Sequence, residues 1–256
     1  DNLVTLSLPD KSTQSITITT APLDPAVKVP ESIMTTAAYM DGQLMFVVPA
    51  MGALPAAYDY RGDCRWYCTE NLTFAMKNLQ NGRLSIGSFR LMEKPYYTTG
   101  LLEMDLVGKI YAEYRLPGGY HHDQFEMEDG SLLVLTECFS SGTVEDMCVL
   151  IDRKDGRILK TWDFKEILPQ DASPSGSWSA HDWFHNNALW YDKQTDSITL
   201  SGRHQDVLIN IDFQTGNLNW ILGDPEGWPE DLVANYFLTP IGDLEWQYEQ
   251  HACIVT

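Results

Sequence analysis

The chain has 256 residues, of which 44% are hydrophobic and eight are tryptophan, and its formal net charge at pH 7 is −19. This composition is typical of a globular protein, and so acidic a chain is not expected to bind nucleic acid, which needs basic surfaces. No apolar run approaches the roughly 20 residues of a membrane helix, so no membrane span is expected.

The first 28 residues alternate between apolar and polar positions. They read LVTLSLP and then SITITT, and they close on APLDP. This pattern predicts two strands and a proline-bounded linker. We interpret residues 1–28 as the C-terminal part of a small β-sandwich domain that begins before residue 1.

From about residue 30 a unit is repeated, with a period on the order of 50 residues. Each copy has an Asp-Gly-like turn, an apolar strand, a second strand, an Asp-x-x-Gly type of turn, and a third strand that ends in an aromatic residue. The first halves cover residues 41–48, 81–88, 129–136 and 196–203, and the second halves cover residues 56–67, 101–114, 148–162 and 207–220. Three or four short strands per repeat are typical of propeller blades. The predicted fold class is therefore all-β, with a β-propeller over residues 29–256.

The Asp and Gly residues of the second turns need no chemical role. Glycine permits a positive φ in a tight hairpin, and aspartate caps the turn. We assign these eight residues to folding: Asp59, Gly62, Asp105, Gly108, Asp152, Gly156, Asp212 and Gly216.

Three histidines occupy the same place in successive repeats. HHDQFEM (121–127) and HNNALWYD (185–192) are expected to be innermost strands, and HACIVT (251–256) matches the start of another. Since innermost strands line the channel of a propeller, His122, His185 and His251 are expected to converge. The chain stops inside this fifth copy, and an open propeller has unpaired edges, so we expect a fragment truncated at its C-terminus.

Residues 179–206 hold three of the six histidines together with Arg203, and no histidine lies in the first 120 residues. We expect His122, His185, Arg203 and His251 to form one site. Neutral imidazole is a good nucleophile near pH 7, which suits His251. The guanidinium of Arg203 suits a tetrahedral oxyanion such as sulfate or phosphate. His122 and His185 can donate to further oxygens or move a proton to the leaving oxygen.

Other polar residues of the region have structural interpretations. His204 follows Arg203 on a predicted strand and should point to the opposite face, and His121 alternates with His122, so that one of them faces away. Arg203 could instead bridge two blades to a carboxylate such as Asp206. We expect loop structure for His181 and Asp182, with Asp182 orienting a histidine, and the sequence assigns no role to Asn186 and Asn187.

The five cysteines leave two alternatives open. Cys64 and Cys68 could form a disulfide across a turn, and Cys138 and Cys148 could join adjacent strands, which leaves Cys253. Free thiols are equally compatible with the sequence, whereas a disulfide would imply export. Zinc at Cys64 and Cys68 is disfavoured, because a second CxxC or a nearby histidine pair is lacking.

A metal or nucleotide cofactor is not expected. Three histidines could bind zinc, as in a metallohydrolase, but no HxH or HxxxH pair lies on a predicted strand or helix. HDWFH (181–185) has i,i+4 spacing but lies in a loop. No P-loop or GxGxxG motif indicates a nucleotide donor.

Five segments together resemble the bacterial arylsulfate sulfotransferases: HHDQFEMEDGSLLVL, DWFHNNALWYD, DSITLSGRHQDVLINID, NWILGDPEGW and QHACIV. The resemblance covers residues 118–256 strongly and the preceding blades weakly. It implies a six-bladed β-propeller preceded by a small β-sandwich. It also implies transfer of a sulfuryl group from a phenolic sulfate ester to a phenol, without a nucleotide donor.

The resemblance further implies a ping-pong mechanism. The residue matching His251 would become transiently sulfated, while those matching His122, His185 and Arg203 hold the sulfuryl oxygens and assist proton transfer. It implies a periplasmic or extracellular location and allows a homodimer. The disulfide of known members cannot be matched to Cys64 and Cys68. The alternative functions are a non-catalytic propeller that binds a ligand or a protein, and metal-dependent ester hydrolysis.

Overall fold

The computed structural model describes the whole chain except residues 1, 20, 36, 37, 39–41, 49–52, 71, 73, 93–96, 171–179 and 256. Position 41 of the first predicted turn and position 179 of the histidine-rich stretch therefore lie outside the described residues. The chain divides into two compact units, residues 1–69 and residues 70–256. Among the described residues, no helix has the length and apolar character needed to cross a membrane.

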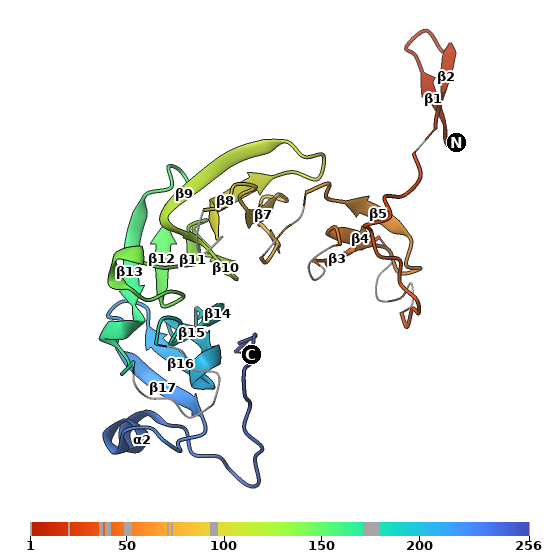
Figure 1. Ribbon diagram of the computed structural model, residues 1–256. Coiled ribbons are helices and arrows are strands. Elements are labelled where there is room, and N and C mark those ends of the chain that lie inside the picture. The colour runs from red at the N-terminus through yellow and green to blue at the C-terminus, as the bar shows by residue number, and fades with distance from the viewer. Residues whose placement is uncertain are drawn as a thin grey trace. The chain divides into compact units, whose positions relative to one another are not determined.

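The first unit contains a hairpin and a three-stranded sheet (Figure 1). The hairpin pairs β1 (Asn2–Ser7) with β2 (Thr13–Ile18), and the sheet contains β3 (Met45–Val47), β4 (Ala56–Tyr58) and β5 (Cys64–Tyr67). The two predicted strands of residues 1–28 are thus present, with large apolar side chains such as Leu3 and Ile16 exposed. That this hairpin closes a β-sandwich, with a domain boundary at residue 28, stays a prediction.

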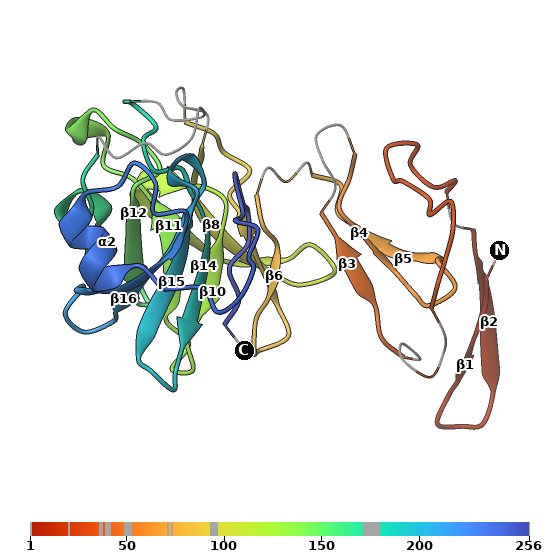
Figure 2. The same cartoon turned by 90° about the horizontal axis from the view of Figure 1, so that it is seen from below.

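The second unit contains three consecutive four-stranded antiparallel sheets, which follow one another in Figures 1 and 2. The first is β6 (Lys77–Asn78), β7 (Leu84–Gly87), β8 (Thr98–Met104) and β9 (Ile110–Tyr120). The second is β10 (Gln124–Glu126), β11 (Leu132–Thr136), β12 (Met147–Ile151) and β13 (Ile158–Asp163). The third is β14 (Asn186–Asp192), β15 (Ser197–Gly202), β16 (Val207–Asp212) and β17 (Leu218–Gly223). In each sheet the strands pair in sequence order, as in the predicted propeller blades.

The Asp-Gly turns behave as the repeat predicts. In the β16–β17 turn, Asp212 accepts a hydrogen bond from the backbone N–H of Thr215 through Oδ1, and Gly216 has a φ of +76°. In the β8–β9 turn, Asp105 accepts from the N–H groups of Val107 and Lys109. These residues close the hairpins, which confirms their assignment to folding.

Two hydrophobic clusters join the sheets of the second unit. One lies between the first and second sheets and includes Leu101 and Tyr120 from one and Val134 from the other. The other joins the second sheet to the third and contains the fully buried Trp183 and Phe184. Burying a large apolar side chain stabilises a fold by about 1.5–3 kcal/mol, so these clusters fix the sheets and the loops between them.

The other regular elements among the described residues are short helices. Three are 3₁₀ turns, η1 (Phe139–Ser141), η2 (Phe164–Glu166) and η3 (Arg203–Gln205), and one is the α-helix α2 (Glu230–Tyr236). After α2 the chain returns to β14 and β15 (dark blue in Figure 1), where Gln250 hydrogen-bonds to Ser201. Residues 251–255 do not form the innermost strand that the repeat predicts. An antiparallel strand needs a partner, and the described residues contain no next strand of a fifth sheet.

Candidate active site

His122 and His185 each lie in a strained turn, and the two turns have the same backbone conformation. Each turn leads into the innermost strand of one of two successive sheets. Their φ angles are +53° and +52°, in the left-handed region that residues other than glycine rarely adopt. His122 lies between β9 and β10, and His185 lies directly before β14. The two ring centroids are 5.1 Å apart. Such a conformation persists only where the surrounding structure holds it, and here it turns both imidazoles toward one point.

His251 joins this pair from the C-terminal segment. Its ring centroid lies 6.0 Å from that of His185 and 6.3 Å from that of His122. One nitrogen from each of the three rings lies within 4.8 Å of the others. The structure thus brings together the three histidines that the repeat register placed in one channel.

Gln250 anchors the segment that carries His251. Its backbone carbonyl accepts hydrogen bonds from Asn187 Nδ2 at 2.9 Å and from Ser201 Oγ at 3.1 Å. Its side-chain amide donates to the carbonyl oxygens of Gly202 and Val207. Asn187, to which the sequence assigned no role, therefore positions the loop of His251.

The tautomer of His251 follows from one contact. Its Nδ1 lies 3.0 Å from the backbone carbonyl oxygen of Glu249. Because a carbonyl oxygen only accepts hydrogen bonds, Nδ1 carries the proton. In the neutral ring the other nitrogen, Nε2, keeps its lone pair, which is the requirement for a nucleophile.

His185 lies between two carboxylates. Its Nδ1 is 2.7 Å from Asp182 Oδ2 and 2.8 Å from Glu145 Oε2. Burial alone would lower the pKa of His185, but the hydrogen bonds to Asp182 and Glu145 outweigh it and raise this pKa to about 9. His185 is therefore an imidazolium at neutral pH, and Asp182 orients a histidine, as expected.

Glu145 is the residue of this site that the sequence did not reveal. It lies just before β12 with a φ of +54° and is 5% exposed. Its Oε1 accepts a hydrogen bond from the Tyr97 hydroxyl, and its backbone N–H donates to Glu137 Oε2 at 3.2 Å. Burial opposes ionisation of Glu145, yet the hydrogen bond to His185 holds its pKa below the usual range. No motif marks it, because only the tertiary fold brings residue 145 to residue 185.

His121 and His122 contact each other, which contradicts the expectation that one faces away. Strand alternation does not apply, since both lie in the turn between β9 and β10. Their Nδ1 atoms are 3.1 Å apart, and His121 Nε2 lies 3.2 Å from the Thr136 carbonyl oxygen. His121 thus donates from Nε2 and accepts from His122 at Nδ1, which leaves His122 Nε2 with a lone pair. Burial and the neighbouring His121 lower the pKa of His122 to about 3, so this ring is neutral.

Arg203 and His204 also lie on the same side, so the prediction that His204 points to the opposite face is wrong. Residues 203–205 form η3 and not a strand. Arg203 Nη1 donates to His204 Nε2 at 2.7 Å, and His204 Nδ1 donates to the Asp182 carbonyl oxygen. His204 is therefore a neutral ring that holds the guanidinium next to His185, whose ring centroid is 4.6 Å from that of His204.

The carboxylate nearest to Arg203 is Glu249 and not Asp206. Arg203 Nη2 lies 3.2 Å from Glu249 Oε2, whereas Asp206 accepts a hydrogen bond from the Glu249 backbone N–H at 2.7 Å. Each Nη atom of Arg203 carries two N–H groups, so one on each remains for a ligand. His181 is exposed and contacts the Gly142 carbonyl oxygen, away from the cluster.

No disulfide joins any of the five cysteines, and the geometry excludes the one suggested for Cys64 and Cys68. Cys64 begins β5 and Cys68 follows its end, so they lie along one extended segment and not across a turn. Four residues of strand span roughly 13 Å, about twice the reach of a disulfide. Cys148 pairs with Leu135 in the sheet, whereas Cys138 lies beyond the end of β11, so these two cysteines do not face each other either.

The three imidazoles are close enough to surround one cation. A metal ligand must offer a lone pair, and a protonated imidazole has none. A cation bound there would therefore have to displace the proton that Asp182 and Glu145 favour on His185. Within a chain of net charge −19, His185 and Arg203 supply two cationic side chains at the cluster, and Asp182, Glu145 and Glu249 lie against them.

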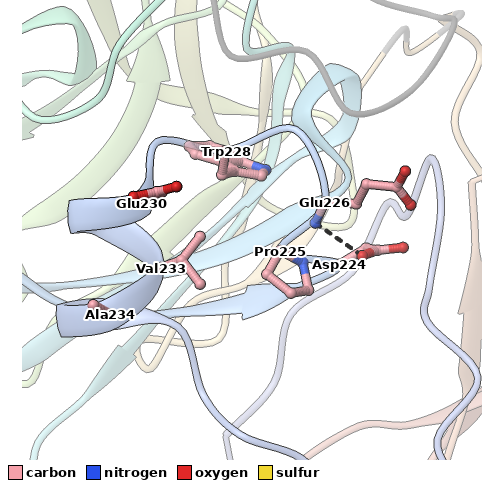
Figure 3. Close-up of a pocket in the computed structure, with 7 residues that line it drawn as sticks. All are labelled: Asp224, Pro225, Glu226, Trp228, Glu230, Val233 and Ala234. Atoms are coloured by element: carbon pink, nitrogen blue, oxygen red, sulfur yellow. Dashed lines mark hydrogen bonds between the residues drawn. The ribbon is translucent and has the colours of Figure 1, made fainter.

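A separate hollow of about 530 Å³ lies beside α2 (Figure 3). Trp228, Val233, Ala234 and Pro225 form its apolar wall, and Asp224, Glu226 and Glu230 lie at its rim. The carboxylates disfavour a sulfate ester there, and none of the site histidines lines it. The histidine cluster is thus the better candidate for chemistry on an anion.

Comparison with known proteins identifies relatives of this chain. Two curated relatives are arylsulfate sulfotransferases, from Lelliottia amnigena (24% identical) and Escherichia coli (25% identical). Each match includes 81% of this chain and 46% of the relative, so the chain spans about half the length of these relatives. A solved structure, virginiamycin B lyase from Staphylococcus aureus, aligns with a TM-score of 0.41 at 11% identity, over 85% of this chain and 62% of that one. Residues 29–256 match the sequence profile of the arylsulfotransferase (ASST) family, and the chain belongs to this family.

Proposed function

We propose that this protein is an arylsulfate sulfotransferase that moves a sulfuryl group from a phenolic sulfate ester to a phenol through a sulfohistidine at His251. The observation that carries the proposal is that the ring of His251 lies 6.0 Å from the cationic ring of His185, while Arg203 is held through His204, whose ring packs on His185. A nucleophile next to an anion-binding site is what attack on a sulfate ester needs. Family membership supports the same reaction class.

The first half-reaction transfers the group to the enzyme. His251 Nε2 forms a bond to sulfur while the bond from sulfur to the aryl oxygen breaks. The free N–H groups of Arg203 hold the sulfuryl oxygens, and the departing phenolate takes a proton from His185. In the second half-reaction the acceptor phenol returns a proton to His185, and its oxygen forms a bond to sulfur. The bond from sulfur to His251 then breaks, and the free enzyme is restored.

His122 supports the site from the other side. It is a neutral ring whose Nε2 can accept a hydrogen bond, so it suits the hydroxyl of an entering phenol better than a sulfuryl oxygen. The account requires no cofactor, because the chemistry uses side chains alone.

The proposal is tested by release of nitrophenol from 4-nitrophenyl sulfate with and without an added phenol. We expect release that depends on the phenol and is lost in His251→Asn, whereas His181→Asn keeps it, because His181 lies outside the cluster. Release without any acceptor, together with bound zinc in elemental analysis, would support metal-dependent hydrolysis instead. No release at all would support the alternative of a non-catalytic binding module.

Location and oligomeric state are proposals of the same kind. Export to the periplasm or the medium follows from the resemblance to the bacterial enzymes and not from the cysteines, which are free thiols. Fractionation of the host cell tests it, and light scattering of the purified protein tests a homodimer.

A further inference from the structure

Glu145 and Asp182 approach the same nitrogen of His185 from different parts of the second unit. Asp182 belongs to the loop that leads into β14, and Glu145 belongs to the loop that leads into β12. Their oxygens lie 2.7 and 2.8 Å from His185 Nδ1. Nδ1 hydrogen-bonds to Asp182, and Glu145 Oε2 lies beside it as a second anionic oxygen, an arrangement that is favourable chiefly when the ring is a cation.

Glu145 is itself held in place by several groups. The Tyr97 hydroxyl donates to Oε1, Glu137 accepts from the backbone N–H, and the backbone carbonyl accepts from the Asn186 N–H at 2.8 Å. The side chain is nearly fully buried, so it cannot turn to water. Oε2 is thereby directed at His185, and also lies 3.9 Å from His122 Nδ1.

The surroundings of His185 contain both signs of charge. The facing carboxylates are Asp182 and Glu145. The facing imidazoles are His121, His122, His204 and His251, and Arg203 lies behind His204. His121 and His204 are neutral because each of these rings accepts a hydrogen bond at one nitrogen and donates from the other. His122 is neutral because its pKa is lowered to about 3. The charged neighbours of His185 are therefore two carboxylates and one guanidinium that is itself paired with Glu249, and removing Glu145 removes one of the two anionic contacts that favour the charged ring.

We propose that Glu145 is a positioning residue that keeps His185 protonated and aimed, so that His185, and not His122, exchanges the proton with the phenol oxygen in both half-reactions. This inference rests on the proposed function. Proton transfer is most efficient when acid and acceptor have similar pKa values. The pKa of His185, about 9, lies close to that of a simple phenol, near 10 on the tyrosine scale.

The consequence concerns the leaving group. Phenyl sulfate releases a basic phenolate that needs a proton as it departs. Nitrophenolate is a much weaker base and needs little help. Loss of the acid therefore costs most for the poorer leaving group, whereas general damage to the site costs equally for both.

The experiment compares transfer from phenyl sulfate and from 4-nitrophenyl sulfate in the intact protein and its Glu145→Gln variant. Glutamine keeps the shape and removes the charge, and its single amide oxygen can replace only one of the two carboxylate oxygens. We expect the variant to lose roughly 10²-fold with phenyl sulfate and less than about 5-fold with 4-nitrophenyl sulfate. Its rate with phenyl sulfate should also begin to fall at a lower pH than in the wild type. Asp182→Asn should show the same selectivity.

Glu126→Gln serves as the matched control. Glu126 is a buried carboxylate paired with Arg153 and not with a histidine. Its variant should keep the wild-type ratio between the two substrates. A second readout needs no turnover: ¹⁵N NMR should show His185 of the wild type protonated above pH 7, and the midpoint of its titration should shift to lower pH in Glu145→Gln.

The outcomes separate the two proposals. If the wild type transfers neither substrate, the proposed function fails, and NMR still tests the charge of His185. If the wild type transfers both but Glu145→Gln slows both equally and leaves the His185 titration unchanged, Glu145 is structural and the inference is overturned.

Discussion

Asn187 Nδ2 lies 2.9 Å from the backbone carbonyl oxygen of Gln250, and this contact ties the start of β14 to the segment that carries His251. The two residues are 63 positions apart in the sequence. The contact places the proposed nucleophile next to the turn of His185. The hydrogen bonds of Gln250 therefore control where His251 lies relative to His185.

We predict that Asn187→Ala slows transfer by about tenfold or more, because a misplaced nucleophile reacts poorly even when it is present. The loss of stability should be small, about 1 kcal/mol, since Ser201 still donates to the same carbonyl. Steady-state rates and thermal unfolding measure the two effects. Wild-type rates in this variant would mean that the segment is held by its other contacts alone.

Arg203→Lys should reduce transfer by roughly 10²–10³-fold, the usual effect of removing an oxyanion donor. Lysine keeps the charge but not the planar fork, and it cannot donate to His204 and a sulfuryl group in the same geometry. The matched control is Arg157→Lys, at an exposed arginine in the β12–β13 turn, which should be silent. If Arg203→Lys transferred the sulfuryl group at the wild-type rate, the Arg203 guanidinium would not be what binds the sulfuryl oxygens.

Glu137→Gln should change how stability depends on pH. Burial raises the pKa of Glu137 to about 8, above its ordinary value of 4.5, and its Oε1 has no hydrogen-bond partner among the described residues. The folded wild type thus holds a proton that the unfolded chain releases, so its stability falls as pH rises from 4.5 to 8.

Glutamine mimics the protonated acid and removes this loss. The free energy of unfolding of the variant should therefore exceed that of the wild type by up to a few kcal/mol at pH 8. Below pH 4.5 the variant should have no such advantage. Urea unfolding at several pH values measures the difference. Glu128→Gln, at an exposed carboxylate, is the control. Its free energy of unfolding should differ from that of the wild type by the same amount at every pH. If the difference in unfolding free energy between Glu137→Gln and the wild type did not change with pH, the raised pKa of Glu137 would be contradicted.

Gly202→Ala should destabilise the protein by about 1–3 kcal/mol. A Cβ at this position would overlap the ring of the fully buried Phe184. Relief of the overlap must move η3, which is tied by backbone hydrogen bonds to Phe184 and His185, so transfer should fall as well. An unfolding curve that matches the wild type would show that the Phe184 ring moves freely, against the packing described here.

The sequence predicted the scaffold well because its signals are local. Alternating apolar residues and Asp-Gly turns predicted a strand over 196–203, and β15 covers Ser197–Gly202. The same repeat aligned His122, His185 and His251, which the structure brings together. Register accounts for His122 and His185, which begin the innermost strands of successive sheets, whereas the segment of His251 forms no strand and is held through Gln250.

What the sequence did not reveal depends on tertiary contacts. Glu145 lies in an irregular loop, and nothing near it in the sequence indicates that it faces His185. The 3₁₀ turn at Arg203 ends the strand one residue earlier than alternation assumed, so His204 was given the wrong face. The His121–His122 contact requires a left-handed backbone at His122, which histidine adopts rarely and no pattern predicts.

The central claim is a covalent sulfohistidine at His251, and intact mass measurement tests it most directly. The protein is mixed briefly with 4-nitrophenyl sulfate in the absence of acceptor and quenched at alkaline pH. We predict a gain of one SO₃ group that maps to the peptide containing His251 and disappears when a phenol is added. Steady nitrophenol release with no adduct on His251 would contradict the account, because the group would then pass to the acceptor or to water without an enzyme intermediate.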